Sequence, residues 1–297
     1  MGKDAMRKVI IELRCNEYAG REANPNVPWS PDEIARDAAE AREAGAAILH
    51  YHARNAETGA ADTAVETYAE TIRRVRSGTD LLINPTLGAT TIDDPGERVA
   101  HIPALGQDPG TAPDMAPVDL ATLNIDPYVP GKGFLVEDLI YRNPISGIRT
   151  EIDAIHTAGA HVDAVLWNVG SARMLGALLD EGLLPEPCFT EVALSNMMLS
   201  THPATEAGLH SLLPFLPEGR HTPWVYLTVG SNAFPLLETA LEAGGHLALG
   251  LGDHDYCELG DAPPRNAEVV AEAVRRIRAA GYEPATPDEA REILGYC

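Results

Sequence analysis

Short runs rich in Val, Ile and Leu alternate along the chain with longer segments in which Ala, Leu, Arg and Glu recur at helical spacing. Such a pattern predicts parallel strands joined by helices. The predicted strands are Val9–Leu13, Ala46–Tyr51, Leu81–Asn84, Leu120–Leu123, Ala164–Trp167, Phe189–Leu194, Trp224–Thr228 and His246–Leu251. Eight strands in 297 residues favour a single-domain α/β (β/α)8 TIM barrel over residues 1–297, since such barrels run to roughly 250 residues. An open doubly wound sheet is the alternative.

Two helices carry explicit start signals. Ser30-Pro31-Asp32-Glu33 places a hydroxyl at the N-cap, proline at the first helical position and glutamate at the third, and Thr286-Pro287-Asp288-Glu289 repeats this arrangement. The first helix is predicted to run from Pro31 to about Ala44, because Gly45 follows at the position where a left-handed backbone favours glycine. The stretch Pro103–Pro117, rich in Pro, Gly and Asp, is predicted to be a long loop before the fourth strand.

Polar residues gather where the predicted strands end. In a barrel, the loops that follow the strands meet at one face and carry the chemistry. The residues at these positions are Glu17, His50, His52, Asn84, Thr86, Asn124, Asp126, Asn168, Ser195, Asn196, Ser231, Asn232, Asp253 and His254. We therefore expect the functional site to lie at this face.

The sharpest local signal is His50-Tyr51-His52. Side chains two positions apart on a strand point to the same face, so both imidazoles can reach one cation in the barrel mouth. Neutral imidazole suits Zn²⁺, which keeps an open position in catalytic sites. The pattern predicts His50 and His52 as metal ligands, and histidines hydrogen-bonded to other protein groups are the alternative.

Glu17 and Asp253 are the candidates for acid–base catalysis. A carboxylate near a cation in a partly closed mouth can remove a proton from carbon. The alternatives are a solvated Glu17 and an Asp253 that only caps a turn. Thr86, in the turn Asn84–Gly88, and Asn124 offer hydrogen bonds to a substrate carboxylate, or alternatively stabilise their own loops.

Composition narrows the partners and the compartment. A formal net charge of -22 disfavours nucleic acids and anionic membranes. A local pocket for an anionic ligand could still form from Arg14, Arg21, Arg54, Lys132 and Arg142. The cysteines, Cys15, Cys188, Cys257 and Cys297, form no CxxC pair, and the first residues hold no signal-peptide apolar stretch, so we expect a reduced cytoplasm. GxGxxG, Walker-type and GxSxG motifs are missing, which disfavours dinucleotide enzymes, NTPases and α/β-hydrolases.

Along nearly its whole length the chain resembles the β-keto acid cleavage enzyme family. The resemblance rests on four segments, which lie within Pro25–Ile34, Glu43–Arg54, Gly244–Leu251 and Ala285–Gly295. It implies a (β/α)8 barrel, usually a homo-oligomer, with zinc held by His50 and His52 and with acetyl-CoA as co-substrate. In the implied reaction, a β-keto acid and acetyl-CoA exchange to give acetoacetate and a new acyl-CoA.

The resemblance also implies roles for the other candidates. Asp253 would take the proton from the carbon between the two carbonyls, and Glu17 matches a further active-site carboxylate. Thr86 and Asn124 fall near the positions that hold the keto-acid carboxylate in the family.

Two positions depart from the family's pattern. Its eighth strand typically reads Gly-His-Val-Arg-Val-Gly-Leu-Glu-Asp, whereas Gly245–Asp253 of this chain reads Gly-His-Leu-Ala-Leu-Gly-Leu-Gly-Asp. Gly252 thus replaces the glutamate that is the third zinc ligand, and Ala248 replaces the arginine that partners the base. Asp253, His254, Glu17 or a water molecule are the candidates to complete the metal site.

Three functions follow from these patterns. The first is a metal-dependent β-keto acid cleavage enzyme that uses acetyl-CoA. The second is a metal-dependent hydrolase or lyase on the same barrel, without CoA. The third is a catalytically altered homologue that binds a small acid, which Gly252 and Ala248 make plausible.

Overall fold

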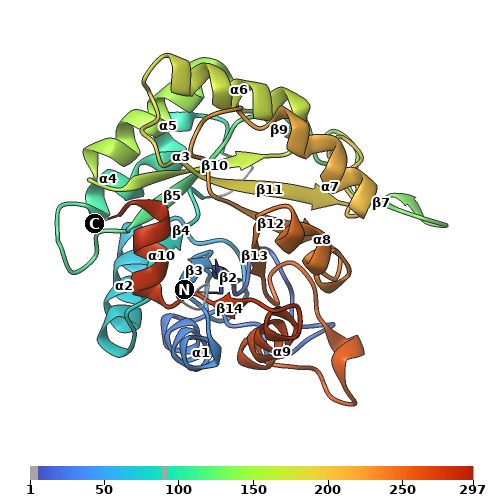
Figure 1. Ribbon diagram of the computed structural model, residues 1–297. Coiled ribbons are helices and arrows are strands. Elements are labelled where there is room, and N and C mark those ends of the chain that lie inside the picture. The colour runs from blue at the N-terminus through green and yellow to red at the C-terminus, as the bar shows by residue number, and fades with distance from the viewer. Residues whose placement is uncertain (1–5, 89–91, 297) are drawn as a thin grey trace, which may run out of the picture.

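Eight parallel strands form the centre of the molecule, as seen in the computed structural model, which describes residues 6–88 and 92–296 (Figure 1). In the order of the sheet they are β4 (Leu82–Pro85), β3 (Ile48–Tyr51), β2 (Ile11–Arg14), β13 (His246–Leu249), β12 (Trp224–Val229), β11 (Phe189–Ser195), β10 (His161–Leu166) and β5 (Met115–Asp119). The two outer strands of this order meet, because the Asp114 N–H donates to the Ile83 carbonyl at 3.0 Å. The sheet therefore curls into a nearly closed barrel, which confirms the predicted (β/α)8 fold.

Helices surround this barrel (Figure 1). They are α1 (Pro31–Ala44), α2 (Val65–Gly78), α3 (Pro95–Val99), α4 (His101–Leu105), α5 (Ile145–Thr157), α6 (Val169–Asp180), α7 (Glu206–Leu212), α8 (Leu237–Glu242) and α9 (Asn266–Ala279), with 3-10 turns at Leu213–Phe215, Phe234–Leu236 and Cys257–Leu259. Helix α1 has the predicted bounds: the Ser30 hydroxyl accepts from the Glu33 N–H at 3.2 Å, and Gly45 ends the helix with φ 124°. In the described part of the chain, every helix is too short or too polar to cross a membrane.

The C-terminal helix α10 (Pro287–Leu294) covers one end of the barrel. Its residues Ala290 and Leu294 share a buried cluster with Ile10, Met115 and Phe189, which lie where barrel strands begin. A short parallel pair of β1 (Lys8–Val9) and β14 (Glu283–Pro284) brings the chain to this end. The opposite end, where the strands stop, is therefore the one left for a functional site.

The fourth barrel strand lies earlier than the sequence predicts. It is β5 at Met115–Asp119, so the predicted strand Leu120–Leu123 is wrong, and the predicted loop Pro103–Pro117 is interrupted by α4 and by the start of β5. Pro117 obscured this strand because proline has no N–H to donate to a ladder. It is tolerated here because β5 is the last strand of the ladder and pairs in register only with β10.

An excursion follows β5 before the chain returns to α5. It contains two antiparallel pairs, β6 (Leu123–Asn124) with β9 (Ile140–Tyr141) and β7 (Tyr128–Val129) with β8 (Gly133–Phe134). In Figure 1 the middle part of this excursion, at β7, extends away from the barrel.

A buried ion pair ties this region together. Arg98 of α3 is 2% exposed, and its guanidinium donates to Asn143 Oδ1 at 2.6 Å and to Glu151 Oε1 of α5 at 3.2 Å. Breaking a buried pair by removing one partner typically costs about 3–5 kcal/mol. Burial raises the pKa of Glu151 to about 7, so this residue can take up a proton when it loses its partner.

We therefore expect Arg98→Ala to lower the free energy of unfolding by roughly 3 kcal/mol, at the low end of that range. Urea denaturation at neutral pH measures this change. The matched control is Arg275→Ala on α9. Arg275 is exposed, and because water screens its ion pair with Glu272, this substitution should change the free energy of unfolding far less. Equal effects of the two substitutions would contradict the structural role of Arg98.

Candidate active site

Three possible metal ligands converge at the open end of the barrel. His50 lies on β3, His52 follows that strand, and Glu17 belongs to the loop after β2. Glu17 Oε1 is 3.1 Å from His50 Nε2, and Glu17 Oε2 is 2.7 Å from His52 Nε2. The three ligand atoms lie within 4.8 Å of one another. Both imidazoles are buried, so the structure brings the predicted pair together on the inner face of the barrel.

This donor set suits a divalent cation such as Zn²⁺, which binds imidazole nitrogen and carboxylate oxygen. A histidine must be neutral to bind a metal ion, and burial lowers the pKa of His52 below its ordinary value although Glu17 counteracts it. The buried His50 Nδ1 has no hydrogen-bond partner among the described residues. The residues present therefore fit the group that the sequence predicts.

The loop that carries Glu17 is fastened to the histidine segment. Glu17 itself has a φ of 33°, which is uncommon for a residue with a side chain. The Asn16 side chain accepts from the His52 N–H and donates to the His52 carbonyl, each at 2.9 Å. Arg54 donates to the carbonyls of Asn16, Glu17 and Ala19. Its guanidinium thus holds this loop, and its predicted role in substrate binding stays a prediction.

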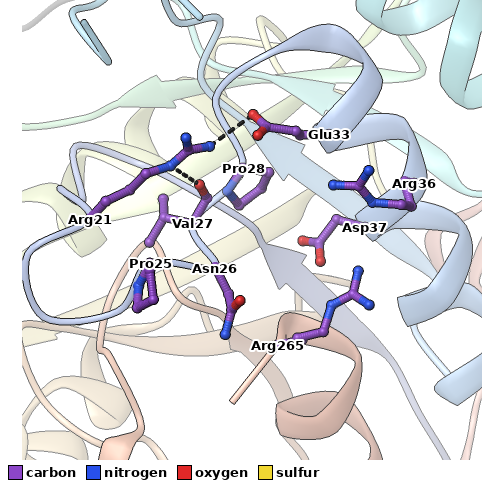
Figure 2. A pocket seen from close by; sticks show the side chains of 9 residues that line it. All are labelled: Arg21, Pro25, Asn26, Val27, Pro28, Glu33, Arg36, Asp37 and Arg265. Carbon is purple, nitrogen blue, oxygen red and sulfur yellow. Dashed lines mark hydrogen bonds and ion pairs between the residues drawn. The ribbon is translucent and has the colours of Figure 1, made fainter. Parts of the chain in front are cut away.

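The far side of the same loop rests on α1. Arg21 donates to the Val27 carbonyl and to Glu33 of α1, both at 2.8 Å (Figure 2). A pocket of about 310 Å³ lies beside this contact and is also lined by Pro25, Asn26, Pro28, Arg36, Asp37 and Arg265. The charge of Arg265 is paired with Glu40 at 2.6 Å. With anchors on both sides, the loop holds Glu17 in a defined place.

One buried arginine links three carboxylates around the site. Arg14, the last residue of β2, places Nη2 2.9 Å from Glu17 Oε1, Nη1 3.1 Å from Glu191 Oε2 and Nε 3.1 Å from Asp253 Oδ2. Burial raises the pKa of Asp253 to about 8, although Arg14 counteracts it. Glu17 behaves differently: burial would raise its pKa, but Arg14 and the two histidines hold it well below the ordinary value. The two predicted carboxylates therefore differ in their readiness to take a proton.

A layer of buried polar side chains lies next to Arg14 inside the barrel. Asn84 Nδ2 donates to Glu12 Oε1 at 3.1 Å and to Asp163 Oδ2 at 2.9 Å. Burial raises the pKa of both Glu12 and Asp163 well above the ordinary values. Burial therefore favours the neutral, protonated form of both carboxyls.

The sequence patterns did not single out Glu12, Asp163 and Glu191, and Arg14 was predicted only as part of a possible anion pocket. A signal was present: Glu12 and Arg14 alternate with Ile11 and Leu13 in one predicted strand. Charged residues at alternate positions of a buried strand point to one face, which here is the barrel interior.

The remaining predicted residues differ in their placement. Thr86 is buried at the same rim. Its N–H donates at 3.1 Å to the carbonyl of Tyr51, the residue between the two histidines in the sequence. Asn124 is exposed on β6, and its side chain accepts from the Asp126 N–H at 3.1 Å. Among residues 6–88 and 92–296, no hydrogen bond joins Asn124 to His50 or His52, so its role stays a prediction. His254 pairs with Glu258 at 2.9 Å.

Known proteins match this chain over nearly its whole length. The family model of the beta-keto acid cleavage enzymes matches residues 8–296. Two 3-keto-5-aminohexanoate cleavage enzymes are similar over most of the chain. The one from Fusobacterium nucleatum is 28% identical over 97% of this chain and 98% of its own. The one from Acetoanaerobium sticklandii is 29% identical over 98% of this chain and 99% of its own.

A more distant relative is named for a different activity. A 3-dehydrocarnitine:acetyl-CoA trimethylamine transferase from Rhizobium meliloti is 26% identical over 91% of this chain and 90% of its own. Among solved structures, the ternary complex of ObcA with a C4-CoA adduct and oxalate matches with a TM-score of 0.73 and 16% identity, over 91% of this chain and 68% of that chain. The latter similarity supports the barrel fold alone. Because the family model spans nearly every residue, the chain belongs to the β-keto acid cleavage enzyme family.

Proposed function

We propose that this protein is a metal-dependent β-keto acid cleavage enzyme that converts a β-keto acid and acetyl-CoA into acetoacetate and a new acyl-CoA. The observation that carries the proposal is the cluster of Glu17, His50 and His52, which Arg14 joins to Asp253. The names of the relatives, with their cleavage of keto acids and use of acetyl-CoA, support it.

In this proposal, His50, His52 and Glu17 hold the cation. When bound, Zn²⁺ would act as a Lewis acid that polarises the keto oxygen of the substrate. Three protein donors would leave the ion an open position for that oxygen, as catalytic zinc sites do. Thr86, at the same rim, is the proposed partner of the keto-acid carboxylate.

Asp253 is the proposed base. It takes the proton from the carbon between the two carbonyls, and the electron pair of that C–H bond forms a C–C bond to the thioester carbon of acetyl-CoA, which expels the CoA thiolate. The thiolate attacks the original keto carbon, and the bond from that carbon to the central carbon breaks. The central carbon then takes the proton back from Asp253, which leaves acetoacetate and the new acyl-CoA. A pKa raised toward neutrality suits a carboxyl that both takes and returns a proton.

The experiment is turnover of a panel of β-keto acids with acetyl-CoA labelled with ¹³C in the acetyl group. We expect the label to appear in acetoacetate, with unlabelled acyl groups on the new CoA thioester. Consumption of a keto acid without any thioester would instead favour the hydrolase or lyase. Tight binding of a keto acid without turnover across the panel would favour the small-acid-binding homologue.

A further inference from the structure

Gly252 packs so closely against Glu17 that a side chain at residue 252 would overlap Glu17. A Cβ atom at residue 252 would lie 2.6 Å from Glu17 Cγ, 2.7 Å from the Glu17 nitrogen and 2.9 Å from the Arg14 carbonyl oxygen. Real Cβ atoms essentially never approach another atom closer than 3.0 Å. The loop after β2 can therefore take its observed path only if residue 252 is glycine. That path places the Glu17 carboxylate between His50 and His52.

Ala248 and Arg14 lie on the two neighbouring strands that precede Gly252 and Glu17, namely β13 and β2. Ala248 of β13 is paired with Glu12 of β2, two residues before Arg14. Because alternate residues of a strand share a face, Arg14 points into the barrel as Glu12 does. Ala248 belongs to the buried cluster of the barrel interior. Both side chains thus enter the same interior from neighbouring strands, and Arg14 is the one that reaches Asp253.

The guanidinium of Arg14 contacts both the proposed metal ligand Glu17 and the proposed base Asp253. Its Nη2 contacts the Glu17 carboxylate and its Nε contacts the Asp253 carboxylate, while Nη1 is held by Glu191. With three carboxylates at three edges, the planar group has a single orientation. A lysine has no such fork and could not keep all three contacts.

From these contacts we infer that β2 and its loop supply both groups that β13 lacks: Glu17 is the third protein ligand of the cation in place of residue 252, and Arg14 is the positioning residue of Asp253 in place of residue 248. The inference rests on the proposed function for the identity of cation and base. Its first half concerns binding alone and can be decided without turnover.

The first test is an equilibrium titration of the purified protein with Zn²⁺ against a chromophoric chelator. Glu17→Gln keeps the shape of the side chain and its capacity to accept hydrogen bonds, but replaces a carboxylate ligand by an amide. We expect it to weaken Zn²⁺ binding by at least about 100-fold, the upper end of what loss of an outer-shell partner costs. The cobalt-substituted protein should show a changed visible spectrum in the same variant.

The matched control is Glu258→Gln, which makes the same change at the exposed member of a second group of possible ligands, His254, Asp255 and Glu258. It should bind one zinc with unchanged affinity. Unchanged affinity in Glu17→Gln would overturn the inference for Glu17, and lost binding in Glu258→Gln would place the cation elsewhere.

The second test separates positioning from substrate binding by Arg14. In Arg14→Met, we expect kcat to fall about 100-fold, within the range for general base catalysis, while KM for the keto acid and for acetyl-CoA changes less than about threefold. Arg14→Lys should lie between Arg14→Met and the parent, and it serves as the decisive variant if Arg14→Met does not fold. A rise in KM with unchanged kcat would overturn the positioning role. If no β-keto acid is turned over at all, the proposed function fails, whereas the zinc titration still decides the role of Glu17.

Discussion

Alanine at both His50 and His52 is expected to abolish stoichiometric zinc binding and to lower kcat/KM by about 10³-fold or more. The reason is that two of the three proposed ligands disappear together. A Lewis-acid cation contributes several kcal/mol to the transition state, and each 1.4 kcal/mol is roughly a factor of ten. Elemental analysis of the purified variant and initial rates with an active keto acid provide the two measurements.

The control for this variant is His156→Ala, because His156 is an exposed residue of α5 on the outside of the barrel. It should keep both zinc and activity. Full zinc occupancy in the His50/His52 variant, with unchanged kcat/KM, would show that these histidines do not hold the cation and would contradict the proposal. A melting curve of each variant shows that a loss comes from the site and not from unfolding.

Asparagine at position 253 is expected to lower kcat by about 10³–10⁴-fold, the upper part of the range for general acid–base catalysis. Asparagine matches aspartate in shape and can still accept a hydrogen bond from Arg14, but it cannot take a proton from carbon. Zinc binding should be unchanged, because residue 253 is not among the proposed ligands. Steady-state kinetics at saturating substrates and elemental analysis together check this prediction.

The pH dependence of the parent enzyme follows from the same residue. Asp253 must be ionised to act as a base, so kcat/KM should rise with pH and level off above the pKa of Asp253. Burial raises this pKa from the ordinary 3.8 to about 8, and the positive charge of a bound cation would oppose that rise. We therefore expect the acid limb below pH 8 but well above the ordinary carboxyl value of 3.8.

Asp255→Asn is the control for both measurements, because it removes a neighbouring carboxylate outside the Arg14 network. Its pH profile and kcat should match those of the parent. An Asp253→Asn variant with near-normal kcat would show that another group removes the proton. An acid limb at the ordinary carboxyl value would contradict a base held in a buried environment.

Much of the barrel could be read from local patterns. Helix α1 has its predicted bounds because the signals that start and end it, Ser30, Glu33 and Gly45, act within one helical turn of their positions. His50 and His52 converge because two residues of one strand need only strand geometry to share a face. The strand β5 was misplaced because Pro117 is acceptable only in the last strand of the ladder, and strand order is a tertiary property.

The order of residues alone predicts the alternation of strands and helices, the histidine pair and the two departures at Ala248 and Gly252. It could not show how those departures are resolved. Arg14, Glu191 and Asp253 are far apart along the chain and meet only because the sheet closes into a barrel. Likewise, a glycine leaves only a space, and the tertiary structure decides that the Glu17 side chain fills it. The physical reason is that local patterns set backbone conformation, whereas contacts between loops of different strands depend on the closed sheet that brings them together.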